Sequence, residues 1–176
     1  MKVRSKKFQD GRENMHLEIY YRQCAAMVLF NEDGQVLVAE RNDITNAAWQ
    51  LPQGGVEEGE TIENGALREL KEEIGTSAAT IISIADKAVS YDWPKSIKDQ
   101  PNTNWVGQLV TFVALKFTGT EDQINLNTSQ PEFRAWKWVS LEEIPELIVP
   151  FKRPVYDYAV CQFIPIRDKL LMEKYN

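Results

Sequence analysis

The residues with the clearest chemical potential are three glutamates within five consecutive positions, Glu69, Glu72 and Glu73. On a helix, at about 100° per residue, Glu72 lies about 60° to one side of Glu69 and Glu73 about 40° to the other. We therefore expect the three carboxylates to share one helix face, roughly opposite the edge on which Leu67 and Leu70 pack. Like charges so close together repel one another unless a cation relieves them. Mg²⁺ is the natural partner, because it prefers oxygen ligands and keeps several waters.

Neighbouring residues could complete such a metal site. Arg68 is adjacent to the glutamates and could orient one of the carboxylates. The pair Gly54-Gly55 allows a tight turn, through which a backbone carbonyl could reach the same cation. Taken alone, however, an acidic run is more typical of a solvated helix face than of a metal site.

The spacing across the segment from Gly54 to Thr76 favours the metal site. Gly54 is followed by five residues and Glu60, and then by seven residues and the cluster Arg68-Glu69, Leu70, Glu72-Glu73 and Gly75. This pattern resembles the Nudix box, with Thr76 in place of its final aliphatic residue. A match of this length is far more specific than a glycine-rich loop alone.

The resemblance covers roughly Tyr21 to Phe163. Its other motifs are Tyr21-Arg22, WQLPQGG from Trp49, YDWP from Tyr91, Gly107-Gln108, PEFRAWKW from Pro131 and FKRPVY from Phe151. Together they are similar to the branch of the Nudix family that includes bacterial RNA pyrophosphohydrolases and the bacterial and plant hydrolases of diadenosine tetraphosphate. The resemblance implies the Nudix fold, a mixed β-sheet between helices.

The resemblance also implies roles for the acidic residues. Glu69, Glu72 and Glu73 would ligate Mg²⁺ or Mn²⁺, with Gly54 or Gly55 offering a carbonyl. Glu132 would be a further ligand or a base. Either Glu73 or Glu132 would accept the proton of the attacking water, and Arg68 would support this catalytic set.

The basic and aromatic residues of the same motifs are candidate substrate contacts. By the resemblance, Arg22, Arg41 and Lys152 would face the phosphates, and Tyr91 and Phe151 would flank the base or a phosphate. Alternatively, the two aromatic residues belong to the core and Arg41 is a surface charge. The sequence departs from the branch at Thr111 and Phe112, where a basic residue and Trp usually stand.

The function implied is hydrolysis of a phosphoanhydride bond in a dinucleoside polyphosphate or in a capped or triphosphorylated RNA 5′ end. One alternative is a Nudix hydrolase of another nucleoside diphosphate derivative, such as a nucleotide sugar. Another is a Nudix domain that senses a nucleotide without cutting it. The intact carboxylate set argues against a sensor, which has no need of water-activating acids.

Composition excludes several other chemistries. The only histidine, His16, and two scattered cysteines, Cys24 and Cys161, rule out a histidine-based triad or a zinc site and favour buried thiols over a disulfide. The net charge is −6, and Glu57–Glu73 holds seven acidic and two basic residues. A chain this acidic is a poor nonspecific nucleic-acid binder, and we expect no sequence-specific binding either. No apolar run is long enough to cross a bilayer and no signal peptide is evident, so we expect a cytoplasmic protein.

The catalytic segment is predicted to lie on one central helix. Apolar residues Ala66, Leu67, Leu70 and Ile74 predict a helix over Ile62–Ile74, and Gly75 is placed to cap its end.

The remaining elements are predicted from hydrophobic patterns and from turn residues. Strands are expected at Gln23–Phe30, Val36–Ala39, Ala79–Val89, Gln108–Phe117 and Arg134–Val139, with a turn at Asn31–Gly34 and a long loop at Tyr91–Asn104. A capping box at Ser140 opens a short helix bounded by Pro145 and Pro150, and Pro154 begins a last helix through Phe163. Pro165 is expected to break that helix, with Asp168–Tyr175 resuming it.

This order of elements predicts an α/β (α+β) fold, a mixed β-sheet sandwiched between α-helices. We expect residues 1–18 to form a flexible N-terminal tail and residues 19–176 to form one domain. The oligomeric state is not indicated by the sequence.

Overall fold

The computed structural model of the chain describes residues 4–5, 18–43, 48–94 and 105–174. The strands in these ranges are β1 (Arg4–Ser5), β2 (Glu18–Phe30), β3 (Val36–Arg41), β4 (Trp49–Gln50), β5 (Gln53–Gly55), β6 (Ala79–Ile84), β7 (Val89–Asp92), β8 (Trp105–Phe117) and β9 (Phe133–Val139). The central path runs β4-β3-β2-β8-β6, with β1 and β5 paired to β2, β7 to β8 and β9 to β3. Since β2 and β8 are parallel and the other described pairs are antiparallel, the sheet is mixed, as predicted.

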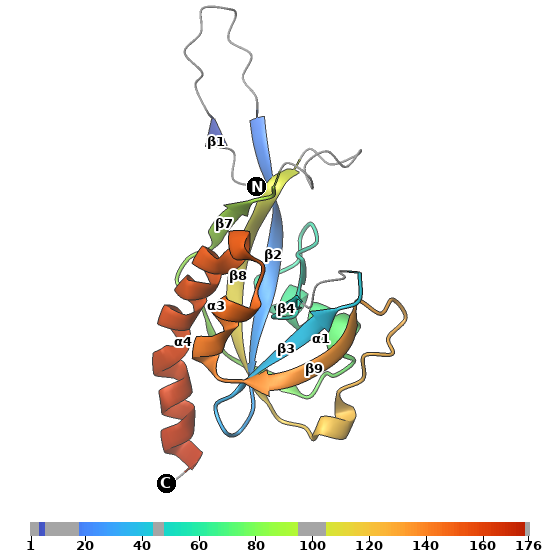
Figure 1. The fold of residues 1–176 in the computed structure, drawn as a ribbon, viewed down its shortest axis with the longest axis vertical. Helices are drawn as coiled ribbons and strands as arrows, with labels where there is room; N and C mark the ends of the chain where they lie inside the picture. Colours follow the sequence, from blue (N-terminus) through green and yellow to red (C-terminus); the bar gives the residue numbers. More distant parts are fainter. Residues whose placement is uncertain (1–3, 6–17, 44–47, 95–104, 175–176) are drawn as a thin grey trace, which may run out of the picture.

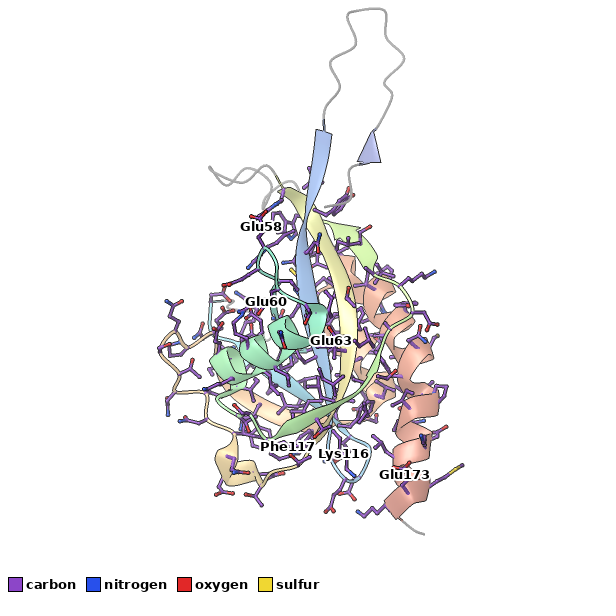
Figure 2. The ribbon with its side chains drawn as sticks, turned by 180° about the vertical axis from the view of Figure 1, so that it is seen from behind. Glu58, Glu60, Glu63, Lys116, Phe117 and Glu173 are labelled. Carbon is purple, nitrogen blue, oxygen red and sulfur yellow. The ribbon has the colours of Figure 1, made fainter. Side chains whose placement is uncertain are left out.

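Both faces of the sheet are covered, which explains why β2 is apolar on consecutive residues. Cys24 and Ala26 belong to one core cluster, whereas Ala25 and Met27 belong to the other. Figure 1 shows α4 (Arg153–Lys174) and the short α3 (Ile144–Leu147) packed over one face. Figure 2, seen from behind, shows α1 (Ile62–Ile74) over the opposite face. The predicted sandwich is therefore confirmed.

Helix α1 begins and ends at the predicted residues. The Thr61 hydroxyl caps its start by accepting a hydrogen bond from the Asn64 N–H at 3.2 Å. Gly75 ends it in the left-handed conformation, with φ 72°, and donates its N–H to the Lys71 carbonyl. The assignment of Leu67 to the packed edge was wrong, because its side chain is 37% exposed. The buried apolar stripe passes through Ala66, Leu70 and Ile74 and leaves position 67 at its margin.

Helix α4 is continuous through Pro165, so the predicted break is wrong. A proline inside a helix leaves the carbonyl four residues earlier without its helical partner, at a cost of about 3 kcal/mol. That carbonyl belongs to Cys161, on the exposed side of the helix, where water can reach it. On either side of the proline, Ile164 and Ile166 pack against the core and oppose a break.

Other predicted boundaries also needed correction. Ala79–Val89 is not one strand, because a bend at residues 86–87 divides it into β6 and β7, which pair with successive parts of β8. Tyr91 belongs to β7, and residues 95–104 of the predicted loop lie outside the described residues. Pro145 is inside α3, near its start, where its missing N–H costs no helical bond.

The other short elements flank the last strand. They are the 3₁₀ turns at Glu121–Gln123, Leu141–Glu143 and Pro150–Lys152. The predicted capping box at Ser140 is present in the second of these turns. Both thiols are free, but Cys161 is exposed because it faces away from the sheet. No helix among the described residues has the length and apolar character needed to cross a membrane.

Candidate active site

The segment from Leu51 to Gly55 is held against the sheet by backbone bonds. The Met27 N–H donates to the Pro52 carbonyl at 2.9 Å, and the Leu51 N–H donates to the Tyr156 hydroxyl at 3.1 Å. Tyr156 is fully buried in α4. The segment therefore has a fixed position between β2 and α1. Its last two residues, Gly54 and Gly55, lie against charged side chains.

Gly54 and Gly55 admit two of these charged side chains. A Cβ atom at Gly54 would lie 1.8 Å from the Glu69 carboxyl carbon, and one at Gly55 would lie 2.5 Å from Nη2 of Arg22. Any larger residue at either position would displace a charged group from the site. Gly54 and Gly55 lie in strand β5 and not in the expected tight turn, and the close approach of backbone and side chain is the reason that these positions require glycine.

Arg68 donates hydrogen bonds to the carboxylates next to strand β5. Its guanidinium donates to both oxygens of Glu60 at 2.9 and 2.8 Å, to Glu69 at 2.8 Å and to Glu72 at 3.1 Å. It also donates to the Gly55 carbonyl at 2.7 Å. These hydrogen bonds fit the predicted role of Arg68 in orienting a carboxylate. Arg68 does not line the central cavity described below.

Glu73 is a buried carboxylate at the centre of the site. Its side chain is 4% exposed, and Oε2 accepts a hydrogen bond from the Gln53 N–H at 2.8 Å. Burial raises the pKa of Glu73 well above its usual value, and the charges of Glu132 and Glu69 raise it further. The pKa of Glu69 is also raised, again mainly by burial. Burial thus disfavours the charged form of both carboxylates when no cation is bound.

The structure corrects one part of the helical-wheel expectation, because the three helix glutamates do not all lie opposite the packed edge. Glu73 lies at the edge of the buried stripe, whereas the Glu72 side chain is 57% exposed and contacts Arg68. Relative to Leu70, Glu72 lies about 160° around the helix and Glu73 about 60°. The packed face is therefore next to Glu73 and opposite Glu72.

Acidic and basic side chains converge on one polar cavity of about 290 Å³. Its lining residues are Arg22, Arg41, Gln50, Gln53, Gly54, Glu69, Glu73, Gln108, Glu132 and Lys152. The cavity thus brings together candidate residues from the sequence analysis and three glutamines from the same sequence motifs. Among the candidates, Arg68, Glu72, Tyr91 and Phe151 are not part of its lining.

Glu132 reaches the cavity from the segment before β9. Its backbone carbonyl accepts the Asn42 N–H at 3.0 Å, and the Asn42 amide donates to the Pro131 carbonyl at 2.6 Å. The Glu132 carboxylate is half exposed and lies 3.7 Å from Arg41. Arg41 also donates through Nε to Asp43 at 2.7 Å, so it is held at the cavity rim by two carboxylates.

Lys152 is the most buried of the three cations. Its ammonium lies 3.5 Å from Oε1 of Gln50 and 5.4 Å from the centre of the Tyr91 ring. Burial, aided by the charge of Arg41, lowers the pKa of Lys152 to about 8. Arg22, on the opposite wall, stacks over Trp105 with its Cζ 5.8 Å from the ring centre.

The two aromatic candidates lie behind the cavity wall. Tyr91 is 7% exposed and belongs to the core cluster under α4. Its ring contacts that of Phe151 at a centroid distance of 5.8 Å. Phe151 is half-buried and reaches the surface beside Lys152. The alternative of core packing therefore describes Tyr91, whereas Phe151 combines a packed side with an exposed one.

Three glutamines in the lining, Gln50, Gln53 and Gln108, were not identified as functional from the sequence. Gln50 and Gln53 stand within WQLPQGG, and Gln108 precedes a long apolar run in β8. A neutral amide carries no charge signal, and two of these glutamines lie in strands too short to show a period. The available signal was a polar residue at the boundary of an otherwise buried segment.

The oxygen atoms of the cavity suit a hard divalent cation. Among the described residues, no three His, Cys, Asp or Glu side chains are already gathered into a group that could hold a metal ion. However, one oxygen of Glu69 and one of Glu73 accept none of the hydrogen bonds found in the described chain. These oxygens belong to two carboxylates whose charged form is disfavoured mainly by burial, and they fit a cation that binds with modest side-chain movement.

Comparison with known proteins places this geometry in a family. The sequence model of the NUDIX domain matches residues 20–159. An RNA pyrophosphohydrolase of Rickettsia rickettsii (strain Sheila Smith) is 41% identical over 149 residues, which are 84% of this chain and 92% of that protein. An RNA pyrophosphohydrolase of Rickettsia typhi is 40% identical over 151 residues, covering 85% and 94% of the two chains.

Solved structures agree on the fold. The E. coli dihydroneopterin triphosphate pyrophosphohydrolase superposes with a TM-score of 0.60 at 23% identity, over 82% of this chain and 99% of that chain. A C. elegans Ap4A hydrolase binary complex gives a TM-score of 0.51 at 22% identity, over 85% and 93%. At these identities the structures support the fold alone. With the family match and the curated relatives, however, the conclusion is that this chain belongs to the NUDIX domain family and is a hydrolase acting on pyrophosphate bonds.

Proposed function

We propose that the chain is a Mg²⁺- or Mn²⁺-dependent RNA pyrophosphohydrolase, which removes pyrophosphate from a 5′-triphosphorylated RNA end. The observation that carries this proposal is a single cavity lined by three carboxylates and three cations, namely Glu69, Glu73 and Glu132 together with Arg22, Arg41 and Lys152. A polyphosphate with its cation presents both signs of charge and matches such a cavity. The curated relatives are named RNA pyrophosphohydrolases, and this chain matches them over most of their length, which supports the choice of substrate.

The carboxylates would hold the metal. Glu69 and Glu73 would contribute their free oxygens, Glu132 would approach from the β9 side, and the Gly54 carbonyl would complete the set. Glu72, on the exposed side of α1, would act from solvent or through water. When bound, the divalent cation supplies charge neutralisation at the phosphoryl oxygens and acidifies water.

Glu73 is the better placed of the two candidate bases. A carboxylate accepts a proton most usefully when its pKa approaches the working pH, and burial moves the pKa of Glu73 in that direction. The Gln53 N–H holds one of its oxygens, and the two lone pairs of the other oxygen would serve the cation and the attacking water. Glu132 is half exposed, so its role would be to position the cation.

The three cations of the cavity would stabilise the phosphates. Arg22, Arg41 and Lys152 would place positive charge where the leaving phosphate gains negative charge. Phe151, with Tyr91 behind it, would offer a face on which the first base stacks, which gives binding without strict sequence reading.

An assay of phosphate and pyrophosphate release tests the proposal. Purified protein with Mg²⁺ is offered 5′-triphosphorylated RNA, diadenosine tetraphosphate, nucleoside triphosphates and a nucleotide sugar. We expect pyrophosphate from the RNA at the highest kcat/KM, loss of activity with a chelator, and recovery with Mg²⁺ or Mn²⁺.

Other outcomes of this assay would point to the rival functions. Preference for diadenosine tetraphosphate would assign the chain to dinucleoside polyphosphates, with the same chemistry. Preference for the nucleotide sugar would assign it to nucleoside diphosphate derivatives. Binding of nucleotides without any turnover would indicate a sensor, and hydrolysis that survives thorough chelation would exclude the metal mechanism.

A further inference from the structure

The pairing of β3 with β9 is irregular at the point where β3 ends. Arg41, the last residue of β3, is the register partner of Phe133, whereas a regular ladder would pair it with Arg134. Arg134 is thus the extra residue of a β-bulge, a feature that re-aims side chains next to active sites. The shift places Arg41 opposite the residue that directly follows Glu132.

Asn42, the residue after β3, fixes the backbone of the segment that carries Glu132. Its N–H donates to the Glu132 carbonyl at 3.0 Å, and its side-chain amide donates to the Pro131 carbonyl at 2.6 Å. The buried ring of Phe133 anchors the same segment where β9 begins. One exposed residue therefore holds two adjacent carbonyls and gives the Glu132 backbone a fixed place beside the cavity.

Asp43 fixes the side chain of Arg41 through a two-point ion pair. Nε of Arg41 donates to one Asp43 oxygen at 2.7 Å, and Nη2 donates to the other at 2.5 Å. Paired contacts of this kind define the plane of a guanidinium group. Nη1 is the nitrogen outside the pair, and it lies 3.7 Å from Oε2 of Glu132. At this distance Nη1 attracts the carboxylate without a hydrogen bond.

This loose contact leaves the Glu132 carboxylate able to turn to a cation. Without Asp43, the Nε and Nη2 edge of Arg41 could form the same two-point pair with Glu132. Such a pair would compete with the cation for both carboxylate oxygens. Asp43 therefore keeps Arg41 near Glu132 and also prevents Arg41 from capturing it.

We propose that Asn42 and Asp43 are positioning residues for Glu132: Asn42 holds its backbone, and Asp43 engages Arg41 so that the Glu132 carboxylate stays at the cavity and available to the divalent cation. This assignment rests on the proposed function, because it takes Glu132 as a ligand of that cation. The competing explanation is that both residues only stabilise the end of β3. Their loss would then lower the melting temperature and leave cation binding unchanged.

Two substitutions and a matched control separate these explanations. Asn42→Ala removes the side-chain donor and keeps the backbone bond to Glu132. Asp43→Asn keeps the size of the side chain and removes the charge that engages Arg41. The control is Glu40→Gln, which breaks an ion pair of 2.8 Å with Arg134 on the same two strands, outside the cavity lining.

The main measurement is titration of the full chain with Mn²⁺ alone, followed by electron paramagnetic resonance of the free ion. We expect Asn42→Ala and Asp43→Asn each to bind Mn²⁺ about tenfold more weakly, as when a group that orients a metal ligand is removed. Glu40→Gln should bind Mn²⁺ as wild type does. Thermal unfolding of all the proteins shows whether affinity and stability change together.

Kinetics on triphosphorylated RNA give a second readout. In Asn42→Ala and Asp43→Asn, the Mn²⁺ concentration for half-maximal activity should rise about tenfold, in step with the lost affinity. The activity at saturating Mn²⁺ should return close to that of wild type, because mass action restores the bound state. A loss of activity that saturating Mn²⁺ does not restore would contradict a role in positioning a metal ligand.

Double variants test whether the two residues act through Glu132. If they do, Glu132→Gln combined with Asn42→Ala or Asp43→Asn binds Mn²⁺ no more weakly than Glu132→Gln alone. Additive losses would overturn the positioning role. Should either single variant fail to fold, Asn42→Ser or Asp43→Ala is expected to give the same loss and decides in its place.

The inference and the proposed function can fail separately. Wild-type Mn²⁺ affinity in Asn42→Ala and Asp43→Asn, whatever their melting temperatures, would overturn the inference while RNA hydrolysis stands. Unchanged Mn²⁺ affinity in Glu132→Gln would also overturn it, since there would be no ligand to position. Weakened Mn²⁺ binding in the variants, with no RNA turnover by the wild type, would uphold the inference and reject the proposed substrate.

Discussion

Glu73 pairs a negative charge with almost complete burial, a combination that a folded protein tolerates only for a reason. We predict that Glu73→Gln nearly abolishes turnover while leaving the fold intact, because the amide keeps the shape and can still accept from the Gln53 N–H. Steady-state kinetics and circular dichroism of the same preparation check this. A fully active variant, or one that loses structure and activity together, would contradict it.

The same substitution makes a prediction about stability and pH. The pKa of Glu73 is raised above its ordinary value of 4.5, so the folded state binds this proton more tightly than the unfolded state does. The free energy of unfolding therefore decreases as pH rises from 4.5 to the folded-state pKa, by about 1.4 kcal/mol per pH unit in that interval. Without metal, Glu73→Gln should be more stable than wild type at pH 7, and the difference should vanish below pH 4.5. Denaturant unfolding across this pH range in the presence of chelator is the measurement.

Lys152 gives a second pH dependence, this time in catalysis. Its pKa is lowered to about 8 by burial, so the free enzyme loses this positive charge as pH rises through 8. Since kcat/KM reports the free enzyme, we predict that it decreases above pH 8, at most about tenfold per pH unit. Lys152→Arg keeps its charge over this range and should flatten the decrease. If the decrease is the same in both proteins, Lys152 is not the titrating group.

At this scale the sequence was informative where charge marked the residue. Glu69, Glu73, Glu132, Arg22, Arg41 and Lys152, all candidates from the sequence, line one cavity, and their roles in it remain predictions. The glutamines were missed because an amide carries no charge signal and its neighbours in the cavity come from other strands, as Tyr91 does for Gln108. The burial of Glu73 was also missed, because helical periodicity gives angles between residues but not the direction of the sheet.

Among the elements, the turn Pro150–Lys152 carries two candidate substrate contacts and connects α3 to α4. Phe151 in this turn packs one side on Tyr91 and exposes the other. We predict that Phe151→Ala raises KM for RNA about tenfold to a hundredfold, the loss expected for one stacked base. Its loss of stability should stay below the roughly 3–5 kcal/mol of a fully buried phenylalanine.

Phe163 on α4 provides the matched control for this prediction, because its side chain is completely buried. Phe163→Ala should lower the free energy of unfolding by about 3–5 kcal/mol and leave KM unchanged. If Phe151→Ala behaved in the same way, Phe151 would be a core residue and the base would stack elsewhere.

The elements also show where local sequence signals suffice. The limits of α1 were predicted correctly because both its caps, Thr61 and Gly75, are local. The break at Pro165 was predicted wrongly because the forces that keep α4 continuous come from packing against the sheet, which a local pattern does not contain. For the same reason the sequence did not reveal the bend between β6 and β7. The bend arises because the two strands pair with successive parts of β8.

In the whole molecule, the net negative charge is concentrated in one segment of the chain and is not spread evenly. Glu57–Glu73 accounts for five of the six net negative charges, and Figure 2 shows Glu58, Glu60 and Glu63 along and before α1. We expect such a distribution to lower the stability of the metal-free fold and to favour the binding of divalent cations. The mixed sheet and its two covered faces were predictable from the order of elements, whereas the convergence of β2, β5, β8, α1 and the segment before β9 on one cavity required the tertiary structure.

We therefore predict that Mg²⁺ stabilises the folded molecule in the absence of substrate. A ligand that binds only the folded state adds RT ln(1 + [L]/Kd), about 1.4 kcal/mol at ten times Kd. For a chain of this size the melting temperature should rise by roughly 3–6 °C.

Glu73→Gln should melt higher than wild type without metal and gain less from Mg²⁺, because it has lost both the buried charge and a ligand. Glu63→Gln, which removes an exposed charge from the first turn of α1, should respond to Mg²⁺ as wild type does. Scanning calorimetry across a Mg²⁺ titration distinguishes these outcomes. An equal Mg²⁺ response in all three proteins would mean that the cation acts on the acidic surface in general, and the assignment of Glu73 as a ligand would have to be abandoned.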